Sequence, residues 1–305
     1  MLTEKYKIAA GYVLICLIWG STWLAIRLGL GSLTPLISAG LRFLLASIFV
    51  LLFMKMKKIG LQTDPLSIKL YLILCFFSFV IPFGLVYWAE QFIPSGLASI
   101  VFAVMPFFVI LYSWIALKQE RITFNQLFGS ILGFSGIVVI FSENLSLNLS
   151  QQLLGIIAVL ISSSMQAGIG VTIKKYGQNL NPLSMNFIPL LFAGVVLIII
   201  SLLFENSSGW IFDFKAFASI IFLAFFGTVV TFTTYYWLLK RMNVVLLSLS
   251  SFITPITAVI LGWLILEENF SLQTLAGSAL VLIGILFANF RGLKNYYLTK
   301  KKFAS

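Results

Sequence analysis

Histidine is absent from this 305-residue chain, and charged residues make up only 10% of it. Because histidine is the commonest metal ligand and general base near neutral pH, its absence argues against an enzyme. The two cysteines, Cys16 and Cys75, both lie in apolar stretches, so we expect neither a disulfide framework nor a metal site. A nucleotide-binding glycine-rich loop is also missing, which argues against direct use of ATP. The sequence therefore predicts a protein without a cofactor that is not an enzyme.

Apolar residues are what the chain has in abundance: 60% of it is hydrophobic, and the mean hydropathy is +1.07. A soluble protein of this length could not cover so much apolar surface with so few charges. The net charge of +11 arises from short basic clusters between apolar runs, which suits anionic lipid headgroups and not nucleic acid. We therefore expect an integral membrane protein whose partners are lipids and a small-molecule substrate, and which is a monomer, with a dimer as the alternative.

Ten apolar runs are long enough to cross a bilayer, which takes about 20 helical residues. They lie near residues 8–28, 33–54, 68–89, 94–117, 124–142, 153–173, 183–204, 216–239, 244–266 and 272–290. When the loops are assigned alternately to the two sides, all loop lysines and arginines except Lys215 fall on the side of the N-terminus. By the positive-inside rule this side is cytoplasmic. The sequence predicts an all-α, multi-pass protein of the cytoplasmic (inner) membrane with both termini in the cytoplasm.

The two halves of the chain repeat one pattern. Tyr87-Trp88 recurs as Tyr236-Trp237 and Pro106 recurs as Pro255, at one constant offset. Because each half has five predicted helices, an odd number, the second copy must cross the membrane in the opposite direction, and inverted repeats of this kind support alternating access. We predict a first five-helix repeat at 1–142, an external linker at 143–152, a second repeat at 153–290 and a basic cytoplasmic tail at 291–305, with a central cavity between the repeats.

Several short motifs point to one family. They are Trp19-Gly20-Ser21-Thr22-Trp23, Leu41-Arg42-Phe43-Leu44-Leu45-Ala46, Pro106, Glu120-Arg121-Ile122-Thr123 with Gln126 and Gly129, and Glu268-Asn269-Phe270-Ser271 with Gln273 and Gly277. Because it carries these motifs in this order, the chain resembles the EamA family of the drug/metabolite transporter superfamily over roughly residues 11–290. The resemblance implies transport, often export, of amino acids or other small metabolites. The second half departs from the first at Ser162–Met165 and at Asn186, so the expected site is asymmetric.

Eight residues within the predicted spans are candidates for substrate binding: Trp19, Thr22, Arg42, Tyr87, Gln166, Asn186, Thr233 and Tyr236. A buried charge at Arg42 normally faces a cavity or a partner, and its guanidinium can fork onto a carboxylate or phosphate. The alternative for Arg42 is a structural bond to helix-end carbonyls or snorkelling along the helix. For Tyr87 and Tyr236 the alternative is an interfacial aromatic belt, and for the others it is hydrogen bonding between helices.

Four further residues are candidates for gating. Arg27 and Glu90 lie near the outer ends of their helices and could pair as an outer gate, or remain two solvated interfacial charges. Glu90 is also the one acidic residue expected near the cavity, and so the candidate proton carrier. Pro106 and Pro255 are expected to kink two equivalent helices in mid-span. Glu120 and Glu268 are interpreted as structural carboxylates beside helix N-termini.

These features predict a secondary active transporter that moves small polar or amphipathic metabolites by alternating access. Amino acids are the favoured substrates, and export is the favoured direction. The alternative is a channel or a lipid scramblase-like membrane protein, although the sequence has no filter-like repeat or ring of acidic residues.

Overall fold

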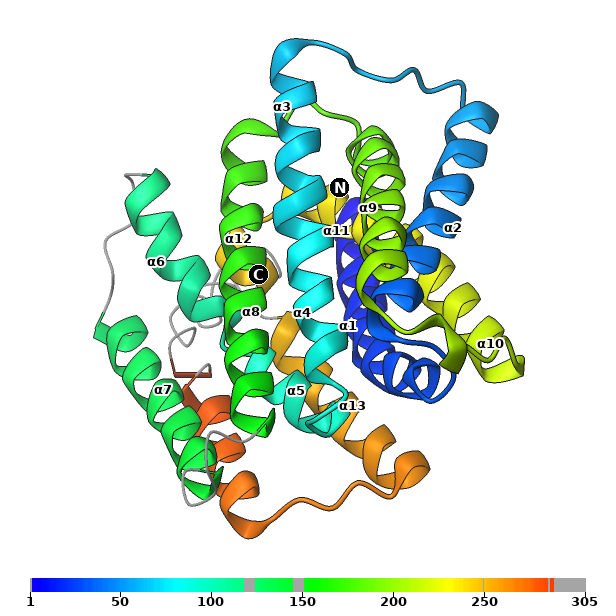
Figure 1. Ribbon diagram of the computed structural model, residues 1–305. Helices are drawn as coiled ribbons and strands as arrows, with labels where there is room; N and C mark the ends of the chain where they lie inside the picture. Colours follow the sequence, from blue (N-terminus) through cyan, green and yellow to red (C-terminus); the bar gives the residue numbers. More distant parts are fainter. Residues whose placement is uncertain (1, 118–123, 145–150, 249, 285, 288–305) are drawn as a thin grey trace.

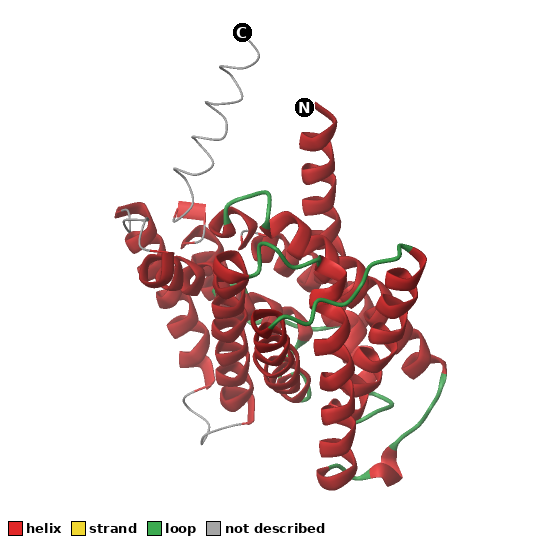
Figure 2. Ribbon diagram, turned by 90° about the horizontal axis from the view of Figure 1, so that it is seen from above, coloured by secondary structure: helices red, strands yellow, loops and turns green. Residues whose placement is uncertain are grey.

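The structure is a computed structural model that describes residues 2–117, 124–144, 151–248, 250–284 and 286–287 (Figure 1). Within these ranges the chain forms helices and loops and no strands, and the first turns of α1 project beyond the other helices (Figure 2). The elements are α1 (Leu2–Leu30), α2 (Pro35–Met56), α3 (Pro65–Leu74), η1 (Cys75–Val80), α4 (Ile81–Ala89), α5 (Ser95–Phe102), α6 (Met105–Leu117), α7 (Phe124–Asn144), α8 (Gln151–Tyr176), α9 (Pro182–Phe204), η2 (Ser207–Gly209), α10 (Phe214–Ala224), η3 (Phe225–Val230), α11 (Thr231–Leu239), α12 (Val244–Ser248) and α13 (Ser250–Leu266).

Seven helical segments of the described chain are long and apolar enough to cross a membrane. They are Tyr6–Leu30, Pro35–Met56, Pro65–Ala89, Ser95–Leu117, Gln151–Tyr176, Pro182–Phe204 and Phe214–Leu239. The other three expected crossings coincide with shorter apolar helices at Leu127–Ile140, Ile253–Leu266 and Leu272–Gly284. The protein is therefore an all-helical membrane protein, and ten complete crossings stay a prediction.

Two segments, Pro65–Ala89 and Phe214–Leu239, share the same local structure. Each begins after an aspartate whose carboxylate accepts a hydrogen bond from a backbone amide of the first turn: Asp64 from Ser67 at 3.1 Å and Asp213 from Ala216 at 2.8 Å. Hydrogen bonds from Ser67 lower the pKa of the Asp64 carboxyl, and the amide of Ala216 lowers that of Asp213. Each segment then widens into one stretch of π-helix, η1 or η3, before it continues as α-helix. The repeat in the sequence thus extends to an unusual detail of backbone geometry.

Pro106 and Pro255 act differently from the shared kink that we expected. Pro106 stands at the second residue of α6, and the chain leaves the α-helix at 103–104, so the expected single helix at 94–117 is two helices, α5 and α6. The reason is that proline clashes with the carbonyl four residues earlier, here that of Phe102, where α5 ends. Pro255 instead lies inside α13.

The carbonyls that these prolines leave without an amide donor are both satisfied by hydroxyl groups. The hydroxyl of Ser163, on α8, donates to the carbonyl of Phe102 at 3.0 Å. The carbonyl of Ser251, four residues before Pro255, accepts from the hydroxyl of Thr254 at 3.2 Å. Proline is tolerated in a membrane helix when another donor, here a hydroxyl group, replaces the missing backbone amide.

Glycines bring equivalent helices of the two halves into close contact. A Cβ atom added to Gly194 on α9 would lie 2.7 Å from the backbone nitrogen of Leu44 on α2. A Cβ atom added to Gly136 on α7 would lie 2.5 Å from the carbonyl oxygen of Gly277, in the helix Leu272–Gly284. Helices in a bilayer are not driven together by the hydrophobic effect, so close packing has to hold them. Small residues at these positions let the two backbones approach closely enough for such packing. The halves are therefore interleaved through paired helices.

Candidate functional site

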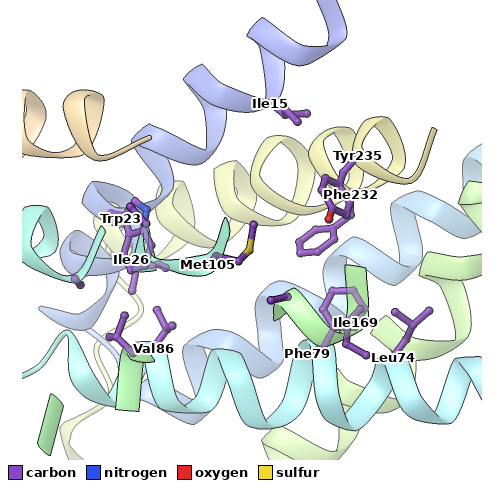
Figure 3. Close-up of a cluster of buried hydrophobic side chains, with 14 of the residues drawn as sticks. Ile15, Trp23, Ile26, Leu74, Phe79, Val86, Met105, Ile169, Phe232 and Tyr235 are labelled. Carbon is purple, nitrogen blue, oxygen red and sulfur yellow. The ribbon is translucent and has the colours of Figure 1, made fainter. Parts of the chain in front are cut away.

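A cavity of about 100 Å³ lies among helices of both halves, with walls from α1, α2, η1, α4, α5, α6, α8, α11 and α13. Its apolar lining consists of Trp19, Trp23, Ile26, Phe83, Val86, Phe102, Met105, Ile169, Gly170 and Phe232. Figure 3 shows Trp23, Ile26, Met105 and Phe232 within one cluster of buried side chains that come from different helices. Its polar lining consists of Thr22, Arg42, Ser78, Ser162, Gln166, Tyr235, Tyr236, Ser250, Ser251 and Thr254.

Arg42 is the one charged residue among the described residues of the lining, and its side chain is 1% exposed. Its Nε donates to the hydroxyl of Thr228 at 2.9 Å, and its Nη2 donates to the carbonyl of Gly227 at 3.1 Å. Its Nη1 donates to the hydroxyl of Tyr87 at 3.3 Å, and the guanidinium carbon lies 4.8 Å from the ring centre of Phe83. All three acceptors are neutral, so the positive charge has no anionic hydrogen-bond partner among the described residues.

Gly227 lies close to the side chain of Thr22 and at an ordinary contact distance from the guanidinium of Arg42. A Cβ atom added at Gly227 would lie 2.8 Å from the Cγ2 of Thr22 and 3.5 Å from the Nη2 of Arg42. The π-helical segment η3 therefore presents both a carbonyl and a hydroxyl, from Gly227 and Thr228, to the guanidinium. π-Helical turns are frequent at functional sites.

The other π-helical segment, η1, is bound in a related way by a neutral side chain. Gln166 on α8 donates from Nε2 to the carbonyl of Ser78 at 2.8 Å, and the hydroxyl of Ser78 donates to the amide oxygen of Gln166 at 3.1 Å. Both residues line the cavity. Each π-helical segment thus receives a long polar side chain from the opposite half of the chain, but only one of the two side chains is charged.

Two buried hydroxyls on the cavity wall have no hydrogen-bond partner in the described part of the chain. They belong to Ser162 and Ser250, whose relative exposures are 1% and 0%. A buried hydroxyl without a partner loses its hydration and gains nothing in return, so such groups in a cavity indicate a place for a polar ligand.

The structure brings together five of the eight predicted substrate-binding residues: Trp19, Thr22, Arg42, Gln166 and Tyr236. Tyr87 does not line the cavity but lies beside it, fully buried, where its hydroxyl accepts from Arg42; an interfacial belt is therefore wrong for this residue. Asn186 and Thr233 do not line it either, because the amide of Asn186 donates to the hydroxyl of Thr233 at 3.2 Å and to the carbonyl of Pro182 at 3.0 Å. These two residues join α9 to α11.

The predicted outer pair, Arg27 and Glu90, is in contact through the main chain. The guanidinium of Arg27 donates to the backbone carbonyl of Glu90, which follows α4 directly. The carboxylate of Glu90 is 0% exposed, and neither of its oxygens has a hydrogen-bond partner in the described ranges. The alternative of two solvated interfacial charges is therefore wrong for Glu90, whose side chain is fully buried.

Two other carboxylates join the halves at one face of the molecule. Glu268 accepts from the amide of Ser95 at 2.7 Å, from its hydroxyl at 2.7 Å and from the amide of Gly96 at 3.0 Å. Glu205 accepts from the amides of Leu36 and Ile37 at 2.9 and 3.2 Å. The expectation that Glu268 is structural and stabilises a helix N-terminus holds, but the helix is α5 of the other half and not its own. We call Glu205 and Glu268 the face carboxylates; Glu120 lies outside the described residues.

Sequence reasoning missed several wall residues, among them Ser78, Ser162, Ser250 and Thr254. Serine and threonine are common in membrane helices, so a single hydroxyl in a span carries little signal. The usable signal was the departure at Ser162–Met165, where the second half replaces the Trp-Gly motif with hydroxyl residues.

Comparison with known proteins agrees with this architecture. The model of the EamA-like transporter family matches twice, at residues 7–142 and 153–290. The uncharacterized transporter YoaV of Bacillus subtilis (strain 168) is 28% identical over 287 residues, which cover 93% of this chain and 97% of YoaV. The uncharacterized inner membrane transporter YedA of Escherichia coli (strain K12) is 32% identical over 252 residues, which cover 81% of this chain and 78% of YedA.

A solved crystal structure has the same fold. It superposes with a TM-score of 0.72 at 17% sequence identity and covers 94% of this chain and 98% of its own. The twofold match of the family model, together with these relatives, leads to one conclusion: the chain belongs to the EamA-like transporter family.

Proposed function

We propose that this protein is a secondary carrier that moves small amphipathic metabolites across the cytoplasmic membrane by alternating access. The single observation that carries the proposal is the cavity between the halves, in which the guanidinium of Arg42 is buried with neutral partners only. Amino acids and export are the substrate class and direction that the family resemblance favours. The termini are cytoplasmic in this proposal, and the carrier acts as a monomer.

Two features support alternating access. In Figure 1, α3 lies above α4 whereas α11 lies above α10, so the two similar segments run in opposite directions. Opposed copies give a carrier two related conformations that open to opposite sides. The face carboxylates Glu205 and Glu268 join the halves by hydrogen bonds to helix N-termini, which a movement of the halves can break. In this proposal the state described here is closed at that face.

Arg42 anchors the anionic group of the substrate, with Trp19, Thr22, Gln166 and Tyr236 as neighbours in the cavity. Tyr87 orients Arg42, while Asn186 and Thr233 hold α9 against α11 near the site. Arg27, Glu90, Pro106 and Pro255 form the moving parts in this proposal. The contact between Arg27 and the end of α4 opens with the cavity. Pro255 allows α13 to bend, and the break before Pro106 allows α5 and α6 to change their mutual angle.

The test is counterflow in liposomes that contain the purified protein, with radiolabelled amino acids and organic acids. A carrier gives saturable uptake that an internal unlabelled substrate accelerates, whereas a channel gives uptake without this acceleration.

Arg42→Lys retains the charge but loses the two-pronged geometry, so it should weaken affinity by about tenfold or more, and Arg42→Ala should weaken it further. Arg241→Lys, at an arginine that contacts Trp237 away from the cavity, is the matched control. Unchanged affinity in both Arg42 variants would make Arg42 structural.

A further inference from the structure

The charge of the cavity defines its ligand more narrowly than the proposed function does. We propose that the cavity selects small organic monoanions that carry a neutral polar substituent, and that it binds them more tightly than zwitterions of the same shape. A branched 2-hydroxy acid is the type of ligand that we have in mind. This inference rests on the proposed function, because it names the substrate class of the same cavity.

The first step is the positive charge of Arg42, which has no anionic hydrogen-bond partner among the described residues. A guanidinium has five N–H groups, and three hydrogen bonds from Arg42 are accounted for by Thr228, Gly227 and Tyr87. Donors therefore remain for a ligand at the cavity wall. A buried charge is strongly destabilising without a counter-charge, and a ligand carboxylate supplies one together with short charge-assisted hydrogen bonds.

The second step is the lack of a negative charge on the wall. None of the described residues that line the cavity is Asp or Glu. The carboxyl group of Glu90 is buried off the wall, close enough to Arg42 to interact with it electrostatically, but neither of its oxygens accepts a hydrogen bond from a described residue. In an amino acid the ammonium group is attached to the carbon next to the carboxylate. An amino acid that docks on Arg42 would thus place a second positive charge beside the first, without an Asp or Glu on the described wall to pair with its ammonium group.

The third step is the set of unpartnered hydroxyls. Ser162 and Ser250 belong to helices of the second half, α8 and α13, and their buried side chains have no hydrogen-bond partner within the described residues. A hydroxyl can donate or accept, so the two together suit a hydroxyl or keto group on the ligand. Neither side chain can neutralise an ammonium group. The polar wall is therefore complementary to an anion with a neutral polar substituent.

The remaining wall sets the size and the body of the ligand. Trp23, Met105 and Phe232 are among the side chains that form the apolar part of the lining. The cavity volume of about 100 Å³ is far below the ~300–1,000 Å³ of pockets that bind drug-sized ligands. This comparison favours a short aliphatic body over a large aromatic or drug-like one.

The test uses ligands that differ in one group: 2-hydroxy-4-methylpentanoate, leucine, 4-methylpentanoate and 3-methylbutylamine. Binding to the purified full-length protein at pH 7 is measured by calorimetry and by tryptophan fluorescence, because Trp19 and Trp23 line the cavity. We expect the hydroxy acid to bind at least about tenfold more tightly than leucine, and the amine not to bind. Leucine binding as tightly as the hydroxy acid, or more tightly, would overturn the inference.

Two sets of variants assign the effect to the cavity. Arg42→Gln should weaken binding of the hydroxy acid by about tenfold or more and remove its advantage over leucine, while Arg241→Gln should change neither. Ser162→Ala with Ser250→Ala should reduce the advantage of the hydroxy acid over 4-methylpentanoate without removing the preference for anions. If the Arg42→Gln protein retains its thermal transition and still prefers the hydroxy acid over leucine to the full extent, the preference does not arise from Arg42.

The same ligands separate this inference from the proposed carrier function. If the hydroxy acid binds in preference to leucine but shows no counterflow, the carrier function fails and the substrate class stands. If leucine shows counterflow and the hydroxy acid does not compete with it, the carrier function stands and the substrate class is wrong. If a monodisperse protein with a cooperative thermal transition binds none of the four ligands, the substrate class is also wrong.

Discussion

Replacing Glu268 with alanine should open the face of the protein where Glu205 and Glu268 join the halves. Glu268 accepts hydrogen bonds from the amides of Ser95 and Gly96 at the start of α5 and from the hydroxyl of Ser95. A hydrogen bond to a charged group contributes about 1.5–3 kcal/mol. Because Glu268 is partly exposed, we take the lower value for the two amides, which gives about 3 kcal/mol.

This free energy converts into a large change in the balance of conformations. If the bonds exist only in the state closed at this face, their loss shifts the equilibrium toward the open state by about 100-fold, since each 1.4 kcal/mol is a factor of ten. The loss of a helix-capping side chain alone, about 1 kcal/mol, would give a shift of only about fivefold. The measured shift therefore also shows how many of the three bonds break when the carrier opens.

The assay follows the accessibility of Val86, which lines the cavity near the end of α4. A single cysteine at Val86 is placed in a protein whose Cys16 and Cys75 are alanine, and cells are treated with a maleimide that does not cross membranes. In the Glu268→Ala background the external labelling rate should rise toward the 100-fold limit. The matched control is Glu267→Ala, since the neighbouring side chain is exposed. An unchanged labelling rate in a well-folded Glu268→Ala protein would refute the reasoning.

Three further predictions concern the topology, the transport rate and the thermal stability of the protein. Cysteines at Lys57 and Ser208, both exposed, should react with impermeant reagents from opposite sides of the membrane; reaction from the same side would contradict the charge-based topology. Pro106→Ala combined with Pro255→Ala should slow counterflow by several-fold while affinity changes little, whereas an equal loss of both would indicate misfolding or direct contact with substrate. Glu205→Ala removes a carboxylate that accepts two amides of α2 and should lower thermal stability by about 1–2 kcal/mol, measured as the shift of the unfolding midpoint in detergent.

The membrane character, seven of the ten expected spans and the duplication could be predicted from the sequence because each depends on patterns that many residues share. Hydropathy over about 20 residues averages out individual exceptions. The pair Tyr87-Trp88 and its copy Tyr236-Trp237 end helical segments that also match in their aspartate caps and π-helical stretches. Arg42 could be predicted as a cavity residue for a different reason: a single buried charge is expensive enough to stand out against its apolar surroundings.

The partners of individual polar groups could not be predicted, because they depend on how helices far apart in the sequence meet. Glu268 was expected to act on the helix that follows it, but the packing of α13 on α5 brings its carboxylate to Ser95. Asn186 was predicted as a cavity residue because it is polar and lies within a span, yet its amide donates to the hydroxyl of Thr233. The break before Pro106 was missed because proline alone predicts either a kink or an end, and the hydroxyl of Ser163 on another helix is what stabilises the end.

Duplication and divergence have separate effects at the centre of this protein. Both copies retain a π-helical segment, and both segments bind a long polar side chain of the other half, so the geometry of the centre follows from duplication. The side chains differ: Gln166 exchanges two hydrogen bonds with Ser78, whereas Arg42 donates to neutral acceptors only. A second arginine would place two like charges in one small cavity, and a glutamate would neutralise Arg42 permanently. A neutral glutamine opposite an arginine preserves the shape and leaves Arg42 as the one charged residue of the described wall, which is the arrangement that the proposed anionic ligand requires if it is to bind and then leave.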